Sequence, residues 1–122
     1  MRLGDDHGTV TVVAAAVLAV LLTCSMGVAD IARALHVRSE ARTAADAAAL
    51  AAAQELAMPS GQGPDELAYA YAERNGAVLV ACACAAGSAD VVVTVRRSLD
   101  GLWFVPGPTE VSAQARAVVD LP

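Results

Sequence analysis

The chain has 122 residues, of which 57% are hydrophobic and 17% are charged, and its formal net charge at neutral pH is -5. This length allows one domain at most. The hydrophobic content is high for a soluble protein of this size, so part of the chain is expected to lie in a membrane. The sequence contains no Lys and only eight Arg. Because phosphate recognition needs clustered cations, this composition argues against nucleic acid as a partner.

An uncharged apolar segment near the N-terminus is the strongest signal in the sequence. Residues 10–28 read VTVVAAAVLAVLLTCSMGV, and about 20 such residues span a hydrocarbon core of roughly 30 Å. We therefore predict an N-terminal cytoplasmic segment (1–9) and a transmembrane helix (10–29), which would make the chain a single-pass protein of the cell membrane in contact with the lipid bilayer. A buried core helix is the alternative, but the residues after Pro59 are too few to surround it completely.

Two kinds of processing compete with a permanent anchor. A signal peptidase would cut before Asp30, after the small residues Gly27 and Ala29, but the preceding MRLGDDHG lacks the net positive charge of a secretory signal. Alternatively, Cys24 would carry a lipid, although Thr23 is a poor residue directly before a lipidated cysteine. We favour the permanent anchor over both.

The helix is expected to continue beyond the membrane as an alanine-rich helix over residues 30–58. No Gly or Pro occurs between Gly27 and Pro59, and ten of the seventeen residues at 41–57 are alanine, the best helix former. Small side chains along one stripe would let another helix or a sheet approach closely. The residues of this alanine stripe are Ala41, Ala44, Ala45, Ala48 and Ala52. The alternative is a solvated stalk with nothing packed on it.

Residues 59–122 are predicted to form a small α/β domain that packs on this helix. The turn sequence MPSGQG (58–63) precedes a short helix that begins near Pro64 and ends at Asn75-Gly76. Extended segments with apolar residues on one face follow at 77–84, 89–97 and 109–119. The predicted fold class is therefore α+β: a long transmembrane helix extending into an alanine-rich helix, a short helix, and a small three-stranded antiparallel meander. Such a sheet buries little by itself, so its apolar face should cover the alanine stripe.

Few side chains in the chain suit catalysis. Without Lys there is neither a Walker-type phosphate loop nor a Schiff-base lysine, and no serine lies in a Gly-x-Ser-x-Gly context. His7 and His36 lie at opposite ends of the apolar segment and cannot share a metal ion. We therefore expect no enzyme activity, no cofactor, no metal site and no small-molecule substrate, and we expect the chain to act by binding other proteins.

Cys82 and Cys84 lie two residues apart in the first extended segment, so they are expected on the same side of the strand as Val78 and Val80. We predict two buried thiols that pack as small hydrophobic groups. A disulfide within or between chains is the alternative if the domain lies outside the cytoplasm. A metal pair without further Cys or His nearby, or a disulfide across one residue, would require unusual geometry.

The segment LWFVP (102–106) contains the only Trp and the only Phe of the chain and lies between two extended segments. Because large aromatic side chains are over-represented where proteins bind each other, Trp103 and Phe104 are predicted to contact a partner. Alternatively, the two rings fold back and plug the end of a core that has few aromatics.

The segment AADAAALAAA (44–53), placed beyond a membrane helix that opens with GTVTV (8–12), resembles the TadE/TadG-like proteins of Flp-type pilus assembly systems. The short actinobacterial TadE-like proteins are the most similar variant. The motif residues carried over are Asp46, Ala49 and Leu50. A helix ending in Asn-Gly, a valine-rich strand (90–95) and a closing Ala-x-Ala strand (113–117) also match family features.

The resemblance implies a pseudopilin-like minor pilin or accessory protein of a Tad/Flp-type pilus or secretion system. Its partners would be other membrane proteins of that system, including a secretion ATPase and an inner-membrane platform. A prepilin peptidase would cut between Gly8 and Thr9. Prepilins commonly carry Glu at the fifth residue after the cut, where this chain has Val13. This departure favours an accessory protein that stays in the membrane.

The resemblance also implies an N-terminus in the cytoplasm and a C-terminal domain outside it. The positive-inside rule alone gives the opposite orientation, because Arg33, Arg38 and Arg42 outnumber Arg2. Two other functions remain open: a membrane-anchored regulatory subunit, and a small secreted protein released by signal peptidase.

Overall fold

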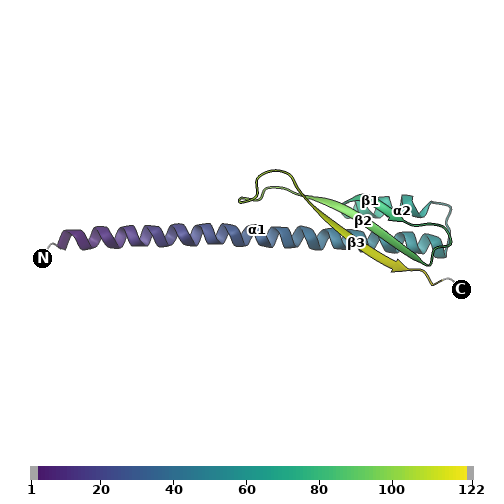
Figure 1. Ribbon diagram of the computed structural model, residues 1–122, viewed down its shortest axis with the longest axis horizontal. Coiled ribbons are helices and arrows are strands. Elements are labelled where there is room, and N and C mark those ends of the chain that lie inside the picture. Colours follow the sequence, from purple (N-terminus) through teal and green to yellow (C-terminus); the bar gives the residue numbers. More distant parts are fainter. Residues whose placement is uncertain (1–2, 121–122) are drawn as a thin grey trace.

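The computed structural model describes residues 3–120. Its longest element is α1 (Leu3–Ala57), one continuous helix that carries a small domain at its C-terminal end (Figure 1). The predicted helices over residues 10–29 and 30–58 form one continuous helix, which begins further N-terminally at Leu3 and ends at Ala57. At about 1.5 Å per residue α1 is roughly 80 Å long, more than twice the hydrocarbon thickness of a bilayer.

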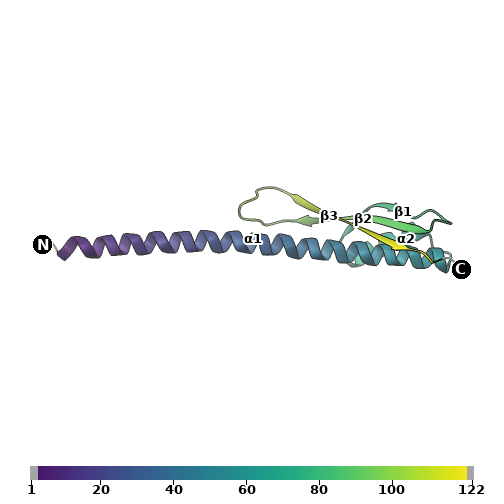
Figure 2. The same ribbon diagram turned by 60° about the horizontal axis from the view of Figure 1, so that its bottom comes forward.

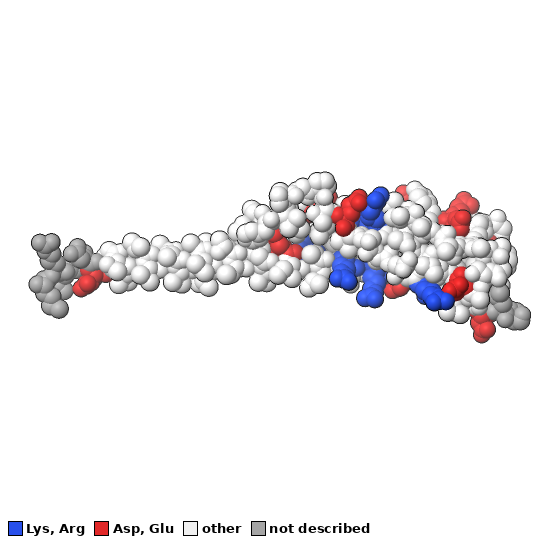
Figure 3. Space-filling view, viewed as in Figure 1, with Lys and Arg blue, Asp and Glu red and all other residues white. Residues whose placement is uncertain are grey.

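The N-terminal half of α1 contacts little else in the described chain. Its apolar side chains are largely exposed, among them Val12 (69%) and Leu22 (64%). Figure 3 shows this half as an uncharged shaft that leads to the charged distal part. By length and composition α1 is able to cross a membrane.

The hydroxyl groups within this shaft are satisfied by the helix itself. Thr11 donates to the carbonyl of His7 at 2.9 Å, and Ser25 donates to the carbonyl of Leu21 at 2.8 Å. Thr23 likewise donates to backbone carbonyls one turn earlier. Such bonds let Thr and Ser lie in an apolar helix without an unpaired polar group.

The chain reverses direction after α1 through a turn that Glu55 stabilises. The Glu55 carboxylate accepts hydrogen bonds from the Ser60 backbone N–H (2.8 Å), the Ser60 hydroxyl (2.7 Å) and the Gly61 N–H (3.2 Å). The Ser60 hydroxyl bond is the largest cause that lowers the pKa of Glu55 below its ordinary value. Glu55 thus holds the turn that positions the next helix.

Helix α2 (Pro64–Arg74) packs on α1 through Ala68 and Ala72, which are fully buried. Pro64 occupies the first turn, where its missing N–H costs nothing. The helix ends at Asn75, and Gly76 follows with φ +72°, a conformation that favours glycine. Both predicted ends of this helix are confirmed within one or two residues.

The sheet is an antiparallel meander in the order β1-β2-β3. Its strands are β1 (Val78–Ala83), β2 (Asp90–Leu99) and β3 (Thr109–Val118). One face lies against α1 and α2, while the other is open to solvent (Figures 1 and 2). The predicted α+β fold is confirmed: a long helix, a short helix and a three-stranded antiparallel sheet.

The core between sheet and helices consists almost entirely of small side chains. All five residues of the alanine stripe are fully buried, and β2 contributes Val91, Val93 and Val95, also fully buried. On β3, Ala115 pairs with Val93 and is 7% exposed. Alanine on the helix lets the sheet approach closely, which is how a domain with so few aromatics excludes water. The alternative of a solvated stalk is wrong for the part of α1 that carries the stripe.

One charged residue lies on the inner face of the sheet. Arg97 forms an ion pair with Glu40 of α1 at 3.1 Å and donates to the Asn75 carbonyl at 3.1 Å. The neighbouring Arg96 lies on the outer face and pairs with Glu110 at 3.3 Å. Arg97 therefore interrupts the apolar inner face with polar contacts to α1, and this face resumes at Leu99, which is 4% exposed.

Strand β1 contains an irregularity that changes which residues face the core. Leu79 pairs with Val95 and Cys82 pairs with Val93, so Val80 is an extra residue between them. Val78 and Val80 are 58% and 53% exposed. The prediction that the two cysteines share a side with these valines is wrong, because the bulge shifts the alternation by one residue.

Candidate functional site

The β2–β3 loop (100–108) extends beyond the sheet and lies along α1, on the side of the domain that faces the N-terminal end of α1. Both ribbon views show it beside the middle of the helix, well away from the packed core (Figures 1 and 2). Gly101 and Gly107 adopt φ +75° and +99°, which non-glycine residues rarely do. The loop thereby leaves and rejoins the strands while its tip lies against α1.

Asp30 of α1 binds the tip of this loop. Its carboxylate accepts the backbone N–H of Trp103 at 2.9 Å and the backbone N–H of Phe104 at 3.0 Å. The other carboxylate oxygen lies 3.1 Å from the Trp103 nitrogen. Hydrogen bonds to an ionised carboxylate are stronger than those between neutral groups, so one side chain orients two consecutive peptide groups.

Arg33, one turn further along α1, holds the start of the loop. Its guanidinium donates to the carbonyl of Gly101 at 3.0 Å. A Cβ atom on Gly101 would lie 3.1 Å from that guanidinium, which is tighter than ordinary packing. Glycine at this position therefore satisfies both the backbone conformation and the close approach of Arg33.

The side chains at the loop tip point away from the domain core. Trp103 is 70% exposed, Phe104 58% and Val105 48%, whereas Leu102 is half-buried. A Cβ atom on Gly27 would lie 3.9 Å from the Phe104 ring, so this ring lies close to the helix on the N-terminal side of Asp30. The alternative in which Trp103 and Phe104 plug the core is wrong. Their predicted role as a partner contact stays a prediction.

The sequence reasoning missed the two residues that position this loop. Asp30 served only to mark the end of the apolar segment, and Arg33 only as a positive charge counted for topology. Their partners lie about 70 residues away in sequence, and no local pattern signals such a contact. The nearest hint in the sequence is that Asp30 is the first acidic residue after the apolar run.

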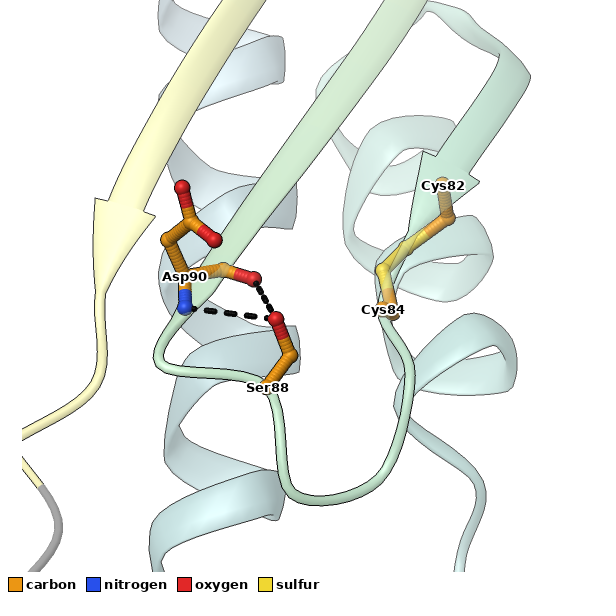
Figure 4. The surroundings of a disulfide bond; sticks show 4 residues. All are labelled: Cys82, Cys84, Ser88 and Asp90. Carbon is orange, nitrogen blue, oxygen red and sulfur yellow. Dashed lines mark hydrogen bonds between the residues drawn. A yellow bond between two sulfur atoms is a disulfide. The ribbon is translucent and has the colours of Figure 1, made fainter.

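Cys82 and Cys84 are joined by a disulfide at the far end of the domain (Figure 4). The prediction of two buried thiols is therefore wrong. Both cysteine side chains lie on the core side of β1 at its C-terminal end. Their Cα atoms are 5.3 Å apart, a spacing that a disulfide can bridge. The Asp65 carboxylate lies near the two sulfurs, all within 4.8 Å. Because metal ions bind thiolates, bonded sulfurs of this kind do not form a metal site.

The turn after the disulfide is fixed by local hydrogen bonds. The Ser88 hydroxyl donates to the Asp90 carbonyl at 2.7 Å (Figure 4). The Asp90 carboxylate pairs with Arg116 on β3. These contacts hold the start of β2. They serve the fold.

The remaining predicted site residues all lie on α1. Gly8 and Thr9 belong to its N-terminal part, where no described atom lies within 4 Å of a Cβ placed on Gly8. Within the alanine-rich motif, Ala49 is 2% exposed and belongs to the core, whereas Asp46 is exposed and Leu50 is 58% exposed. Ala49 therefore has a packing role, while Asp46 and Leu50 face outward one turn apart.

Comparison with known families bears on the helix that carries these residues. A family model described as putative Flp pilus-assembly TadE/G-like matches residues 8–55. Over this segment the chain is similar to TadE/G-like proteins. The TadE/G-like match begins at the GTVTV segment, includes the alanine-rich motif and ends two residues before α1 does. The predicted resemblance is confirmed, and the match supports involvement in Flp pilus assembly. No curated protein and no solved structure matches the chain.

Proposed function

We propose that this TadE/G-like chain is a membrane-anchored accessory protein or minor pilin of a Tad/Flp-type pilus or secretion system, and that it acts by protein–protein contact without catalysis. The observation that carries the proposal is the division of α1 within the family match. The helix is a bare apolar shaft before Asp30 and a buried alanine stripe beyond Ala41. A membrane anchor that carries a rigid domain needs an apolar half that contacts lipid and a second half on which the domain packs.

The bare half of α1 supports the membrane position. Monomeric soluble proteins rarely expose large continuous apolar surfaces, and here every large side chain from Val10 to Leu22 is exposed. In a bilayer the same surface meets acyl chains. The internal bonds of Thr11, Thr23 and Ser25 fit this environment, because no water is available there to satisfy a hydroxyl group.

The orientation we propose places the C-terminal domain outside the cytoplasm. The Cys82–Cys84 disulfide supports it, because disulfides persist in oxidising compartments and are rare in the cytosol. Family resemblance supports the same orientation. Of the three arginines that favour the opposite orientation under the positive-inside rule, Arg33 has a structural partner, because it donates to the Gly101 carbonyl.

Among pilus-system roles, an accessory protein that stays in the membrane has the better support. Val13 stands where prepilins commonly carry Glu, and Gly8 and Thr9 lie in a continuous helix with no break at the bond that would be cut. Outward-facing Asp46 and Leu50 and the exposed loop tip offer contacts to other membrane proteins of the system.

The proposal is tested in the native host with the full chain. Deleting the gene should abolish Flp-type pili or the secretion that depends on them, and the wild-type gene should restore them. The tagged chain should stay in the membrane pellet after alkaline carbonate and should co-purify with platform components after crosslinking. A Leu18→Arg variant, which puts a charge in the middle of the shaft, should lose membrane retention.

Three measurements separate the competing functions. Unchanged pili and secretion in the deletion strain would contradict the proposal and favour a regulatory subunit of another membrane complex. An intact mass that begins at Asp30 would favour a secreted protein released by signal peptidase. Alkaline phosphatase fused to the C-terminus should be active, and an inactive fusion would contradict the orientation.

A further inference from the structure

The β2–β3 loop presents three consecutive apolar side chains beside the end of the proposed membrane segment. Trp103, Phe104 and Val105 are exposed by 70%, 58% and 48%. We propose that these three side chains insert into the lipid interface around the point where α1 leaves the bilayer, and that the loop is a second membrane contact. This inference rests on the proposed membrane anchor and adds a lipid-binding surface to the distal domain.

The level of the membrane surface follows from the charge pattern of α1. No charged residue occurs between Asp6 and Asp30 other than the titratable His7. The uncharged residues 8–29 extend roughly 33 Å at about 1.5 Å per residue, close to the hydrocarbon thickness of about 30 Å. Asp30 therefore lies at the level of the lipid headgroups when the shaft spans the bilayer.

The loop tip is fixed at this same level. Asp30 accepts the Trp103 and Phe104 N–H groups at 2.9 and 3.0 Å, and Arg33 holds the Gly101 carbonyl at 3.0 Å. The Phe104 ring lies near Gly27, one helical turn closer to the membrane than Asp30. The Phe104 ring is thus at or just below the headgroup level, and the Trp103 backbone lies at the level of Asp30.

The chemistry of the tip suits a lipid interface. Trp and other aromatic side chains concentrate at membrane–water interfaces, where an apolar ring and a polar edge are both accommodated. The backbone N–H groups of Trp103 and Phe104 are already bound to Asp30, which lowers the cost of moving this peptide segment out of water. The loop DGLWFVPGP contains no basic residue, so burial of apolar surface drives the contact rather than attraction to anionic lipid.

The contact would fix the tilt and rotation of the domain relative to the membrane. A single helix leaves a domain free to rotate about the helix axis, whereas a second contact point about 70 residues away in sequence removes that freedom. In Figure 1 the hairpin formed by β2 and β3 reaches back from the core to the middle of α1. The sheet would then present its polar outer face in a defined direction.

Trp103 makes the test direct because it is the only tryptophan. The full chain is reconstituted into phosphatidylcholine vesicles, with and without phosphatidylglycerol, and Trp emission is quenched by acrylamide or by phosphatidylcholine brominated at either end of the acyl chain. We expect strong quenching by lipid brominated near the headgroup, weak quenching by lipid brominated near the chain end, and a several-fold lower acrylamide constant than that of an exposed Trp. Phosphatidylglycerol should change none of these results.

A matched control places the tryptophan at the end of β3 that lies farthest from the loop. In a Trp103→Phe background, Val118→Trp puts the probe where Val118 is 75% exposed, far from the loop. This probe should respond to acrylamide and not to brominated lipid. A second variant, Asp30→Ala, releases the loop and should make Trp103 more accessible to acrylamide.

The outcomes separate this inference from the proposed anchor. If the chain stays in the vesicles after alkaline carbonate but Trp103 responds like the Val118→Trp probe, the lipid contact is wrong and the anchor stands. If Trp103 is shielded from acrylamide without quenching by brominated lipid, another protein copy covers the tip and the lipid contact is again wrong. A chain that washes off the vesicles overturns both proposals.

Discussion

The carboxylate of Asp30 accepts the backbone N–H of Trp103 at 2.9 Å, although 73 residues separate them in the sequence. This bond joins the helix, at the point where its apolar half ends, to the tip of a loop that emerges from the far sheet. It holds the tip of the β2–β3 hairpin against α1. The position of the aromatic tip therefore depends on one acidic side chain.

Replacing Asp30 should release the loop while leaving the core intact. Asp30→Ala removes the acceptor for two N–H groups, and because this site is partly exposed we expect a loss of about 1 kcal/mol in local stability. Hydrogen exchange of the Trp103 and Phe104 amides in detergent micelles should become several-fold faster. Asp30→Asn keeps one acceptor oxygen and should have a smaller effect. Unchanged exchange in Asp30→Ala would mean that other contacts hold the tip.

A charge introduced on the alanine stripe should disrupt the domain. Ala48 is fully buried against the sheet, so Ala48→Glu must bury a carboxylate without a partner, at a cost of several kcal/mol. Leu50→Glu is the matched control, because Leu50 lies on the same helix two residues away and is 58% exposed. Chemical unfolding followed by the far-ultraviolet signal should show a large loss for Ala48→Glu only. Equal stability of the two variants would contradict the packing of sheet on helix.

Two adjacent arginines of β2 should differ in their contribution to stability. Arg97 is on the inner face, with its side chain 26% exposed, and bonds both Glu40 and the Asn75 carbonyl. Arg96 is 49% exposed and forms one surface pair. We expect Arg97→Met to lower the free energy of unfolding by about 1 kcal/mol and Arg96→Met by less than about 0.5 kcal/mol. A double-mutant cycle with Glu40→Gln should give a coupling for Arg97 alone, and no coupling would refute the pair.

Glu55 should make stability depend on pH in the acid range. Hydrogen bonds, first that of the Ser60 hydroxyl, lower its folded pKa below the ordinary value of 4.5. Since the folded pKa is depressed, the contribution is fully present above the unfolded pKa and is lost as pH falls through the folded pKa. Wild type should therefore be more stable than Glu55→Gln above pH 4.5, and the difference should vanish at lower pH. A difference that is constant across this range would contradict the assignment to Glu55 ionisation.

The thiol content provides a direct check of the disulfide. The chain has three cysteines, of which Cys82 and Cys84 are bonded and Cys24 is free. Alkylation of the unfolded chain purified from membranes should label one cysteine before reduction and three after it. Three labelled cysteines before reduction would show a cytosolic redox state and would also count against the proposed orientation.

The sequence by itself determined the elements and the inner faces of β2 and β3. The uncharged run at 10–28, the absence of Gly and Pro up to Pro59 and the alternation around Val93 are local signals, because helix and strand periodicity depend only on neighbouring residues. The packing of the sheet on the alanine stripe could be predicted, because the stripe was the one apolar helix face expected outside the membrane. The strand ends were accurate to within about two residues for the same reason.

The tertiary structure decided the features that depend on exact register and on distant contacts. The extra residue Val80 in β1 turned Cys82 toward the core beside Val93, which simple alternation from Val78 could not reveal. Arg97 lies on the same face of β2 as Val93 and Val95, as alternation predicts, but only the assembled fold brings it to its partners, Glu40 of α1 and the Asn75 carbonyl. The loop tip was open to two predictions, core plug or exposed contact, and the bonds to Asp30 decided for exposure. Periodicity reports which way a side chain points within an element, but only the assembled fold brings together groups that are about 70 residues apart.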